Sequence, residues 1–300
     1  MRSTFEVPSR RLRSPFPRFL SPAWGSEGAK NQPAMNAPAT DLYPQKLRRL
    51  YWPFIAVAES SPLVIGTVAG SFRADGRAYT IPRFTFLGPT TNVPQKRIGL
   101  FALIHGDEPA GAATFLKLLE DLAAHPHLAR GYDLVFYPLC NPTGYEDGTR
   151  CNRAGADLNR EFWRASSHPE VKILEQELRS QQFEGLIALH ADDTSDGLYG
   201  YAHGRELNED LLVPALRASE QVIPCNHGAV IDGFTACAGV INDCFTGVLR
   251  PPPEQQPQPF EIIFETPGRA PLEQQAEAAR VAVETILNEH RQFIAYAQDL

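Results

Sequence analysis

The sequence lacks a long apolar run, an excess of basic residues and any paired cysteine motif. No stretch of about 18 apolar residues occurs in its 300 residues, so we expect no membrane-spanning helix. Lys and Arg number 28 against 35 Asp and Glu, and this acidic balance argues against nucleic acid as a partner. The five cysteines are unpaired in the sequence pattern, with no CxxC, which favours a reducing compartment and predicts a cytoplasmic protein.

The first 40 residues differ in composition from the rest of the chain. They hold six prolines, five serines and five arginines, with Glu6 and Glu27 as their only acids. Such a segment buries too little apolar surface to offset its ordering entropy, so we expect a disordered tail over residues 1–40 and one domain over residues 41–300. Two other interpretations stay open: a basic targeting arm, or a true start at Met35 with residues 1–34 as a gene-model artefact.

From about residue 50 the pattern is that of a globular α/β chain. Apolar and polar residues alternate over residues 66–88 around Asp75-Gly76, which predicts a β-hairpin with a tight turn. Buried strands and amphipathic helices then alternate, which predicts a mostly parallel or mixed sheet with helices on both faces. The expected strands span residues 98–104, 132–139, 186–189 and 260–264, and the expected helices span residues 109–124, 169–182 and 271–297.

Two of these strands are followed by residues that can bind a metal. His105 and Glu108 come directly after strand 98–104, and Gly106 permits a tight bend between them. Both are zinc-ligand types, although a His and a Glu at a helix start also serve as capping or surface groups. His190 follows strand 186–189, either as a histidine of the core or rim or as a third ligand. Three ligands leave a fourth position open, as in catalytic zinc sites.

A third polar cluster lies in the segment 150–162. Arg150 is the residue type that binds a carboxylate or a developing oxyanion in bidentate fashion. Asp157 is a carboxylate that could orient Arg150 or a metal ligand by a hydrogen bond. Arg153 and Glu161 are expected to lie in an exposed, charged loop.

A single carboxylate follows the last predicted strand. Glu265 lies between strand 260–264 and the turn Thr266-Pro267-Gly268. Such a residue can act as a general base near a metal-bound water, or it can cap the final helix. The local sequence leaves both interpretations open.

Together these motifs resemble a known family. H-x-x-E at 105–108, N-P-x-G at 141–144, R-x-N-x-x-G-x-D-L-N-R-x-F at 150–162, the strand-end His190 and F-E-T-P at 264–267 occur in the order found in the zinc metallocarboxypeptidase superfamily. This superfamily includes the aspartoacylase and succinylglutamate desuccinylase branch. The resemblance covers residues 96–297 and implies a single domain with a mixed, mostly eight-stranded sheet.

The resemblance also implies roles for individual residues. One Zn²⁺ per chain is expected, with His105, Glu108 and His190 as its ligands. Arg150 is expected to stabilise the oxyanion, and Glu265 to act as general base and proton shuttle. Asn159 and Arg160 are expected to bind the terminal carboxylate of the substrate.

One departure from the family pattern leaves open whether the reaction is that of a carboxypeptidase or of a deacylase. Digestive carboxypeptidases close their site with a Tyr shortly before the catalytic Glu, and no Tyr lies between Tyr201 and Glu265 here. Tyr199 or Tyr201 are the candidates to replace it. The acidic loop 192–196 could select a basic or amine-bearing substrate, or it is a solvated turn.

We therefore predict a zinc-dependent amide hydrolase, a metallocarboxypeptidase that acts on a peptide or a small amino-acid amide with a free carboxylate. An N-acyl amino acid deacylase of the aspartoacylase or succinylglutamate desuccinylase type is the rival. A catalytically inactive binding module with the same fold is the alternative outside enzymes. The expected partner is a small-molecule or peptide substrate, with no nucleic acid and no membrane, and the oligomeric state stays open.

Overall fold

The computed structural model describes residues 44–90, 94–202 and 206–298. The tail predicted over residues 1–40 lies outside these residues. Within the described chain, no helix is both long enough and apolar enough to cross a membrane.

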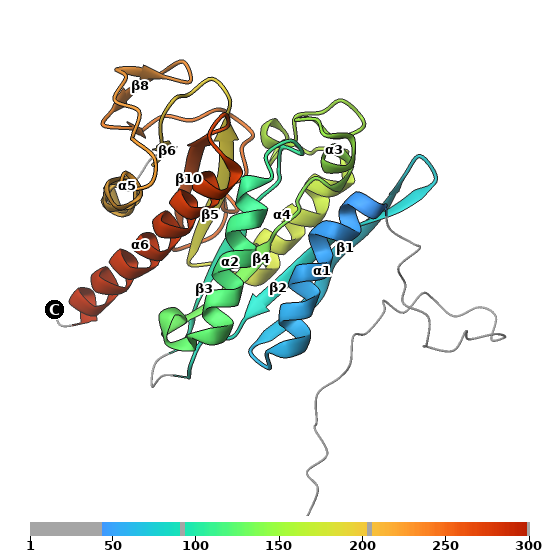
Figure 1. Ribbon diagram of the computed structural model, residues 1–300, viewed down its shortest axis with the longest axis horizontal. Coiled ribbons are helices and arrows are strands. Elements are labelled where there is room, and N and C mark those ends of the chain that lie inside the picture. The colour runs from blue at the N-terminus through green and yellow to red at the C-terminus, as the bar shows by residue number, and fades with distance from the viewer. Residues whose placement is uncertain (1–43, 91–93, 203–205, 299–300) are drawn as a thin grey trace, which may run out of the picture. The chain divides into compact units, whose positions relative to one another are not determined.

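A ten-stranded mixed sheet forms the centre of the described chain (Figure 1). Its strand order is β1-β2-β4-β3-β5-β10-β6-β9-β8-β7. The predicted mixed α/β sheet is confirmed, but the expected number of eight strands is wrong. The short strands β6 to β9 add a further edge beyond β10, and strands of two to four residues carry too little alternation to be recognised in a sequence. The strands are β1 Val64–Ala74, β2 Arg77–Phe86, β3 Lys96–Phe101, β4 Tyr132–Tyr137, β5 Gly185–Asp192, β6 Tyr199–Tyr201, β7 Val230–Ile231, β8 Phe234–Cys237, β9 Val240–Ile241 and β10 Phe260–Pro267.

Helices cover both faces of the sheet, as predicted. Helices α1, α2, α6 and α5 lie side by side in this order against one face of the sheet (Figure 1). On this face Leu100, Ile187 and Phe264 form part of one core cluster. Helix α4 covers the other face, over Leu186 and Ala188. Alternate residues of β5 therefore enter different cores, because successive side chains of a strand point to opposite faces. The helices are α1 Gln45–Ser60, α2 Ala110–Ala124, α3 Pro142–Asp147, α4 Pro169–Gln181, α5 Glu206–Ser219 and α6 Leu272–Gln298, with 3₁₀ turns at Pro126–Ala129 and Leu158–Arg160.

The predicted hairpin is present, with β1 and β2 antiparallel. Asp75 and Gly76 have φ angles of 45° and 76°, which is the conformation of a type I′ turn. This turn matches the twist of the flanking strands, so the Asp-Gly pair specifies both the position and the register of the hairpin.

Strands β3, β5 and β10 are consecutive neighbours in the sheet and run parallel. Their carboxyl ends therefore meet at one edge, which is where ligands bind in open α/β sheets. Strand β3 ends at Phe101, three residues earlier than predicted, and Leu103 then adopts a left-handed φ of 52°. This turn directs the following loop, which carries His105 and Glu108, across the edge of the sheet.

Candidate metal centre

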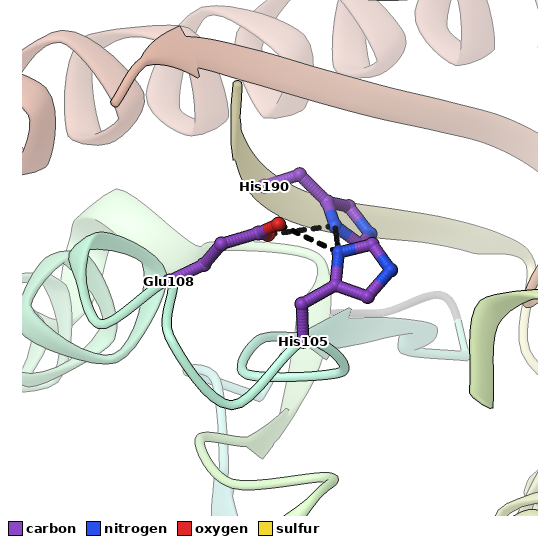
Figure 2. Close-up of side chains that lie close together, drawn as sticks. All are labelled: His105, Glu108 and His190. Carbon is purple, nitrogen blue, oxygen red and sulfur yellow. Dashed lines mark hydrogen bonds and ion pairs between the residues drawn. The ribbon is translucent and has the colours of Figure 1, made fainter. Parts of the chain in front are cut away.

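His105, Glu108 and His190 converge at the carboxyl edge of the sheet. Figure 2 shows the three side chains pointing toward one another, two from the loop after β3 and one from β5. One ligand atom from each residue lies within 4.8 Å of those of the other two. The Nδ1 atoms of the two histidines are 3.2 Å apart, and they lie 2.6 Å and 3.0 Å from the Glu108 carboxylate. All three side chains are buried.

The donor set fits a zinc ion. Two imidazole nitrogens and a carboxylate oxygen are zinc ligands, and all three offer lone pairs toward one point. The polar contacts of the His190 ring lie on its Nδ1 side, since its buried Nε2 has no hydrogen-bond partner among the described residues. On the chemistry of these side chains, a divalent cation is the group that satisfies all three at once.

Burial and neighbouring charges shift the pKa values of all three residues. Burial alone would raise the pKa of Glu108, but His190 and His105 outweigh it and lower this pKa to about 2. Burial lowers the pKa of His190, so its ring is neutral, as a metal ligand requires. Burial also works against a charged His105, but Glu108 and Asp157 raise its pKa overall.

The loop that carries His105 and Glu108 is held by the N-P-x-G turn. The side chain of Asn141 donates a hydrogen bond to the Ile104 carbonyl and accepts one from the Gly144 amide. A Cβ atom at Gly106 would lie 2.0 Å from the carbonyl carbon of Gly144. Gly106 lies in the bend that we expected, and its lack of a Cβ atom is needed for this close approach.

Arg150 and Asp157 lie beside the three candidate metal ligands. Asp157 Oδ1 is 3.2 Å from Nε2 of His105, and its other oxygen is 3.1 Å from the Arg150 guanidinium. Arg150 Nη1 lies 3.2 Å from Nδ1 of His105 and 3.5 Å from Glu108. Asp157 thus contacts both Arg150 and a ligand, the two partners considered for it from the sequence.

His105, Glu108 and Arg150 line a cavity with a volume of about 740 Å³, and Asn159 and Arg160 lie next to each other on its wall. The Asn159 side-chain oxygen accepts a hydrogen bond from the Leu249 amide, which fixes the orientation of the side chain. The Arg160 guanidinium stacks on the Phe245 ring at 3.9 Å. No carboxylate of the described residues lies within ion-pair distance of Arg160, so its charge is available to a ligand.

Glu265 lines this cavity from β10. Its register pairs it with His190 on one side and with Tyr199 on the other, so the three side chains share a face of the sheet. Burial, and then the carboxylates of Glu108, Asp192 and Asp232, raise the pKa of Glu265 well above its usual range. A carboxylate with raised proton affinity is suited to accept a proton.

Both candidate tyrosines are in the cavity wall. The Tyr199 hydroxyl donates to Asp192 at 3.0 Å, and the Tyr201 hydroxyl donates to Asp232 at 2.5 Å. Asp232 was not identified from the sequence. It lies in an Asp232-Gly233 turn between β7 and β8, and this Asp-Gly pair was the signal that could have found it.

Arg153 differs from its expected place in an exposed loop. Its guanidinium pairs with Asp147 at 2.5 Å and Glu146 at 2.8 Å, and it also contacts the Tyr79 hydroxyl. The side chain is 22% exposed. The expectation is wrong because the partners belong to α3 and β2 rather than to the loop itself, and Tyr79 of β2 lies 74 residues away in the sequence.

Comparison with known proteins agrees with these motifs. Residues 94–209 match the model of the succinylglutamate desuccinylase/aspartoacylase catalytic domain. Human Carboxypeptidase D is 27% identical over 181 residues, a match that spans 54% of this chain and only 13% of the human protein.

Solved structures match over a larger part of the chain. A candidate metallopeptidase from Shewanella amazonensis has a TM-score of 0.67 and 24% identity, over 81% of this chain and 92% of that one. A metallo-carboxypeptidase from Burkholderia cenocepacia has a TM-score of 0.64 and 18% identity, over 84% of this chain and 70% of that one. At these identities the structural matches establish the fold, and function has to be argued from the site.

Proposed function

With the resemblance to the zinc metallocarboxypeptidase superfamily confirmed, including its aspartoacylase and succinylglutamate desuccinylase branch, we propose that this protein is a zinc-dependent hydrolase of amide bonds. Its proposed reaction is that of a metallocarboxypeptidase, on a peptide or a small amino-acid amide with a free carboxylate. The observation that carries the proposal is the convergence of His105, Glu108 and His190 beside the cavity that Glu265 lines.

His105, Glu108 and His190 are the residues that would hold one zinc ion. When bound, zinc supplies Lewis-acid chemistry, which makes water acidic enough to act as a nucleophile at neutral pH. Asp157 would hold the His105 ring through Nε2 and leave Nδ1 free for the ion.

Glu265 would move the proton. Its carboxylate would accept a proton from the attacking water and deliver it to the nitrogen of the leaving amine. The Glu265 carboxylate makes no hydrogen bond or ion pair with a side chain of the described residues, which supports this role, because a carboxylate held by protein donors is a poorer base.

Arg150, Asn159 and Arg160 would bind the substrate. Arg150 would donate to the carbonyl oxygen as its negative charge develops, and one such donor is typically worth about 3 kcal/mol in the transition state. Arg160, with Asn159 beside it, would bind the terminal carboxylate and so position the amide bond over the reacting groups.

The deacylase branch is the second candidate, because it is the model of that branch that matches residues 94–209. The matched residues include the three metal-binding candidates but end before Glu265.

The cytoplasmic location stays a prediction from the cysteine pattern.

A substrate panel tests the proposal. The purified protein is stripped of metal, reloaded with zinc and assayed on dipeptides and tripeptides, on the same peptides with amidated C-termini, and on N-acetyl-aspartate and N-succinyl-glutamate. We expect zinc-dependent release of the C-terminal residue from peptides with a free carboxylate. Hydrolysis of the N-acyl amino acids alone would favour the deacylase, and bound zinc without turnover of any amide would favour a binding module.

A further inference from the structure

The charged groups that line the cavity are unevenly paired. Arg150 is engaged by Asp157 and lies near Glu108, whereas the guanidinium of Arg160 has no carboxylate of the described residues within ion-pair distance. Asp192 and Asp232 also line the cavity, and neither has a Lys, Arg or His of the described residues within ion-pair distance. The cavity therefore offers both a cationic position and uncompensated carboxylates.

Hydroxyl groups hold these two carboxylates in place. Asp232 accepts a hydrogen bond from Tyr201, and Asp192 accepts from Tyr199 and from the amide and hydroxyl of Thr194. Neutral donors fix the orientation of a carboxylate without neutralising its charge.

The fold fixes Asp232 independently of the metal-binding loop. Asp232 and Gly233 have φ angles of 48° and 81° and form the two-residue turn between β7 and β8. Tyr201, its partner, lies on β6, which pairs with β10 so that Tyr201 is opposite Ile263 and Tyr199 is opposite Glu265. One antiparallel pairing thus positions both tyrosine hydroxyls that hold these carboxylates beside the proposed reaction centre.

Part of the wall of this cavity is apolar. Phe245, Val248 and Ile263 line the cavity together with Arg160 and Asp232. Such a surface suits the methylene stem of a long side chain that ends in a charged group.

We propose that the cavity selects a substrate whose C-terminal residue carries an ammonium or guanidinium group on its side chain, with Asp232 as the residue that recognises this cation. The inference rests on the proposed function and deepens it, because Arg160 would bind the terminal carboxylate of the same residue. A second carboxylate on the substrate would meet Asp192 and Asp232, so acidic N-acyl amino acids are disfavoured by like-charge repulsion.

The test compares lysine with its uncharged analogue norleucine. N-acylated dipeptides that end in lysine, norleucine or glutamate are assayed for kcat/KM with the zinc-loaded wild type and with Asp232→Asn. Asn tolerates the left-handed backbone conformation at this turn, so the variant removes the charge and keeps the fold. Asp75→Asn is the matched control, since Asp75 occupies the same position in the other Asp-Gly turn and lies outside the cavity.

The wild type should prefer lysine over norleucine at least about tenfold, and Asp232→Asn should lower this ratio about tenfold while norleucine changes by less than about twofold. Asp75→Asn should behave as the wild type. A lysine-to-norleucine ratio near one in the wild type, or an unchanged ratio in Asp232→Asn, would overturn the inference.

Calorimetric binding of free L-lysine and L-norleucine separates this inference from the proposed function. If no amide is hydrolysed but L-lysine binds more tightly and depends on Asp232, the hydrolase proposal fails and the charge selection stands. If both amino acids bind equally, the charge selection fails whatever the turnover.

Discussion

The Nδ1 atoms of His105 and His190 lie 3.2 Å apart, although 85 residues separate the two histidines in the sequence. The contact exists because β3 and β5 are parallel neighbours, so that the loop after β3 and the last residues of β5 reach the same edge. Glu108 contacts both rings, and its carboxylate is also held by the amide of Ala191. Three buried groups with lone pairs directed at one point are best satisfied by a shared cation.

The first prediction concerns the metal. His105→Ala removes one of the three proposed ligands, so zinc bound after dialysis should fall to near the level of a chelator-treated sample, and amide hydrolysis should fall with it. Elemental analysis measures the zinc, and circular dichroism checks the fold. His127→Gln, at an exposed histidine, should keep its zinc. Full activity in a variant shown to be free of metal would remove His105 from the metal site.

The second prediction separates chemistry from metal binding. Glu265→Gln keeps the size of the side chain and removes its ability to accept a proton. We expect zinc content to stay at the wild-type level and kcat to fall by about 10²- to 10⁴-fold. Single-turnover kinetics together with elemental analysis measure both. A kcat close to that of the wild type would show that Glu265 is not the base.

The third prediction concerns the support of a ligand. Asp157 contacts His105 Nε2 and orients the ring, so Asp157→Asn should weaken zinc binding about 10- to 100-fold. Competition with a fluorescent chelator measures the affinity. Glu161→Gln is the control, because the Glu161 carboxylate accepts from Ser166 and does not contact the ligands. Equal affinities for zinc in both variants would contradict a role of Asp157 in holding the ring.

Much of the site could be predicted because each polar group comes directly after a run of apolar residues that marks a strand. Strand β3 precedes Glu108, and β5 and β10 carry His190 and Glu265 near their ends. These strands enter the two cores with alternate residues, and such strands are recognised from their hydrophobicity. Their parallel arrangement follows from the intervening helices, and parallel strands bring their ends together. The sequence specifies less well where each strand ends. Strand β3 was expected to reach residue 104, but it ends at Phe101, before the left-handed Leu103.

The remainder depends on contacts between distant segments. Strands β6 to β9 are held by pairing with β10 and with one another rather than by their own pattern, so Asp232 had no visible partner in the sequence. Arg153 looked exposed because Tyr79 and Glu146, two of its partners, come from other elements. Helix α1 was missed although Leu47, Tyr51 and Phe54 recur at helical spacing and are buried.

The last prediction concerns stability against pH, at a residue far from the metal centre. His290 is buried against Tyr132 and Phe260, with the Tyr132 hydroxyl 3.1 Å from its Nδ1, and burial lowers the pKa of His290 to about 4. In the unfolded chain this pKa is about 6.5. Between these two values the unfolded chain binds a proton that the folded chain does not, so the folded state loses stability as the pH falls.

From pH 7.5 to pH 5 this single group should cost about 2 kcal/mol of the free energy of unfolding. Urea denaturation of the wild type and of His290→Leu at the two pH values measures it, since the leucine cannot titrate and Tyr132 keeps the Leu287 carbonyl as an acceptor. The loss between the two pH values should be about 2 kcal/mol smaller in His290→Leu, whereas His127→Gln should lose as much as the wild type. Equal losses in the wild type and in His290→Leu would mean that His290 is protonated in the folded state, and that Tyr132 and Phe260 accommodate its charge.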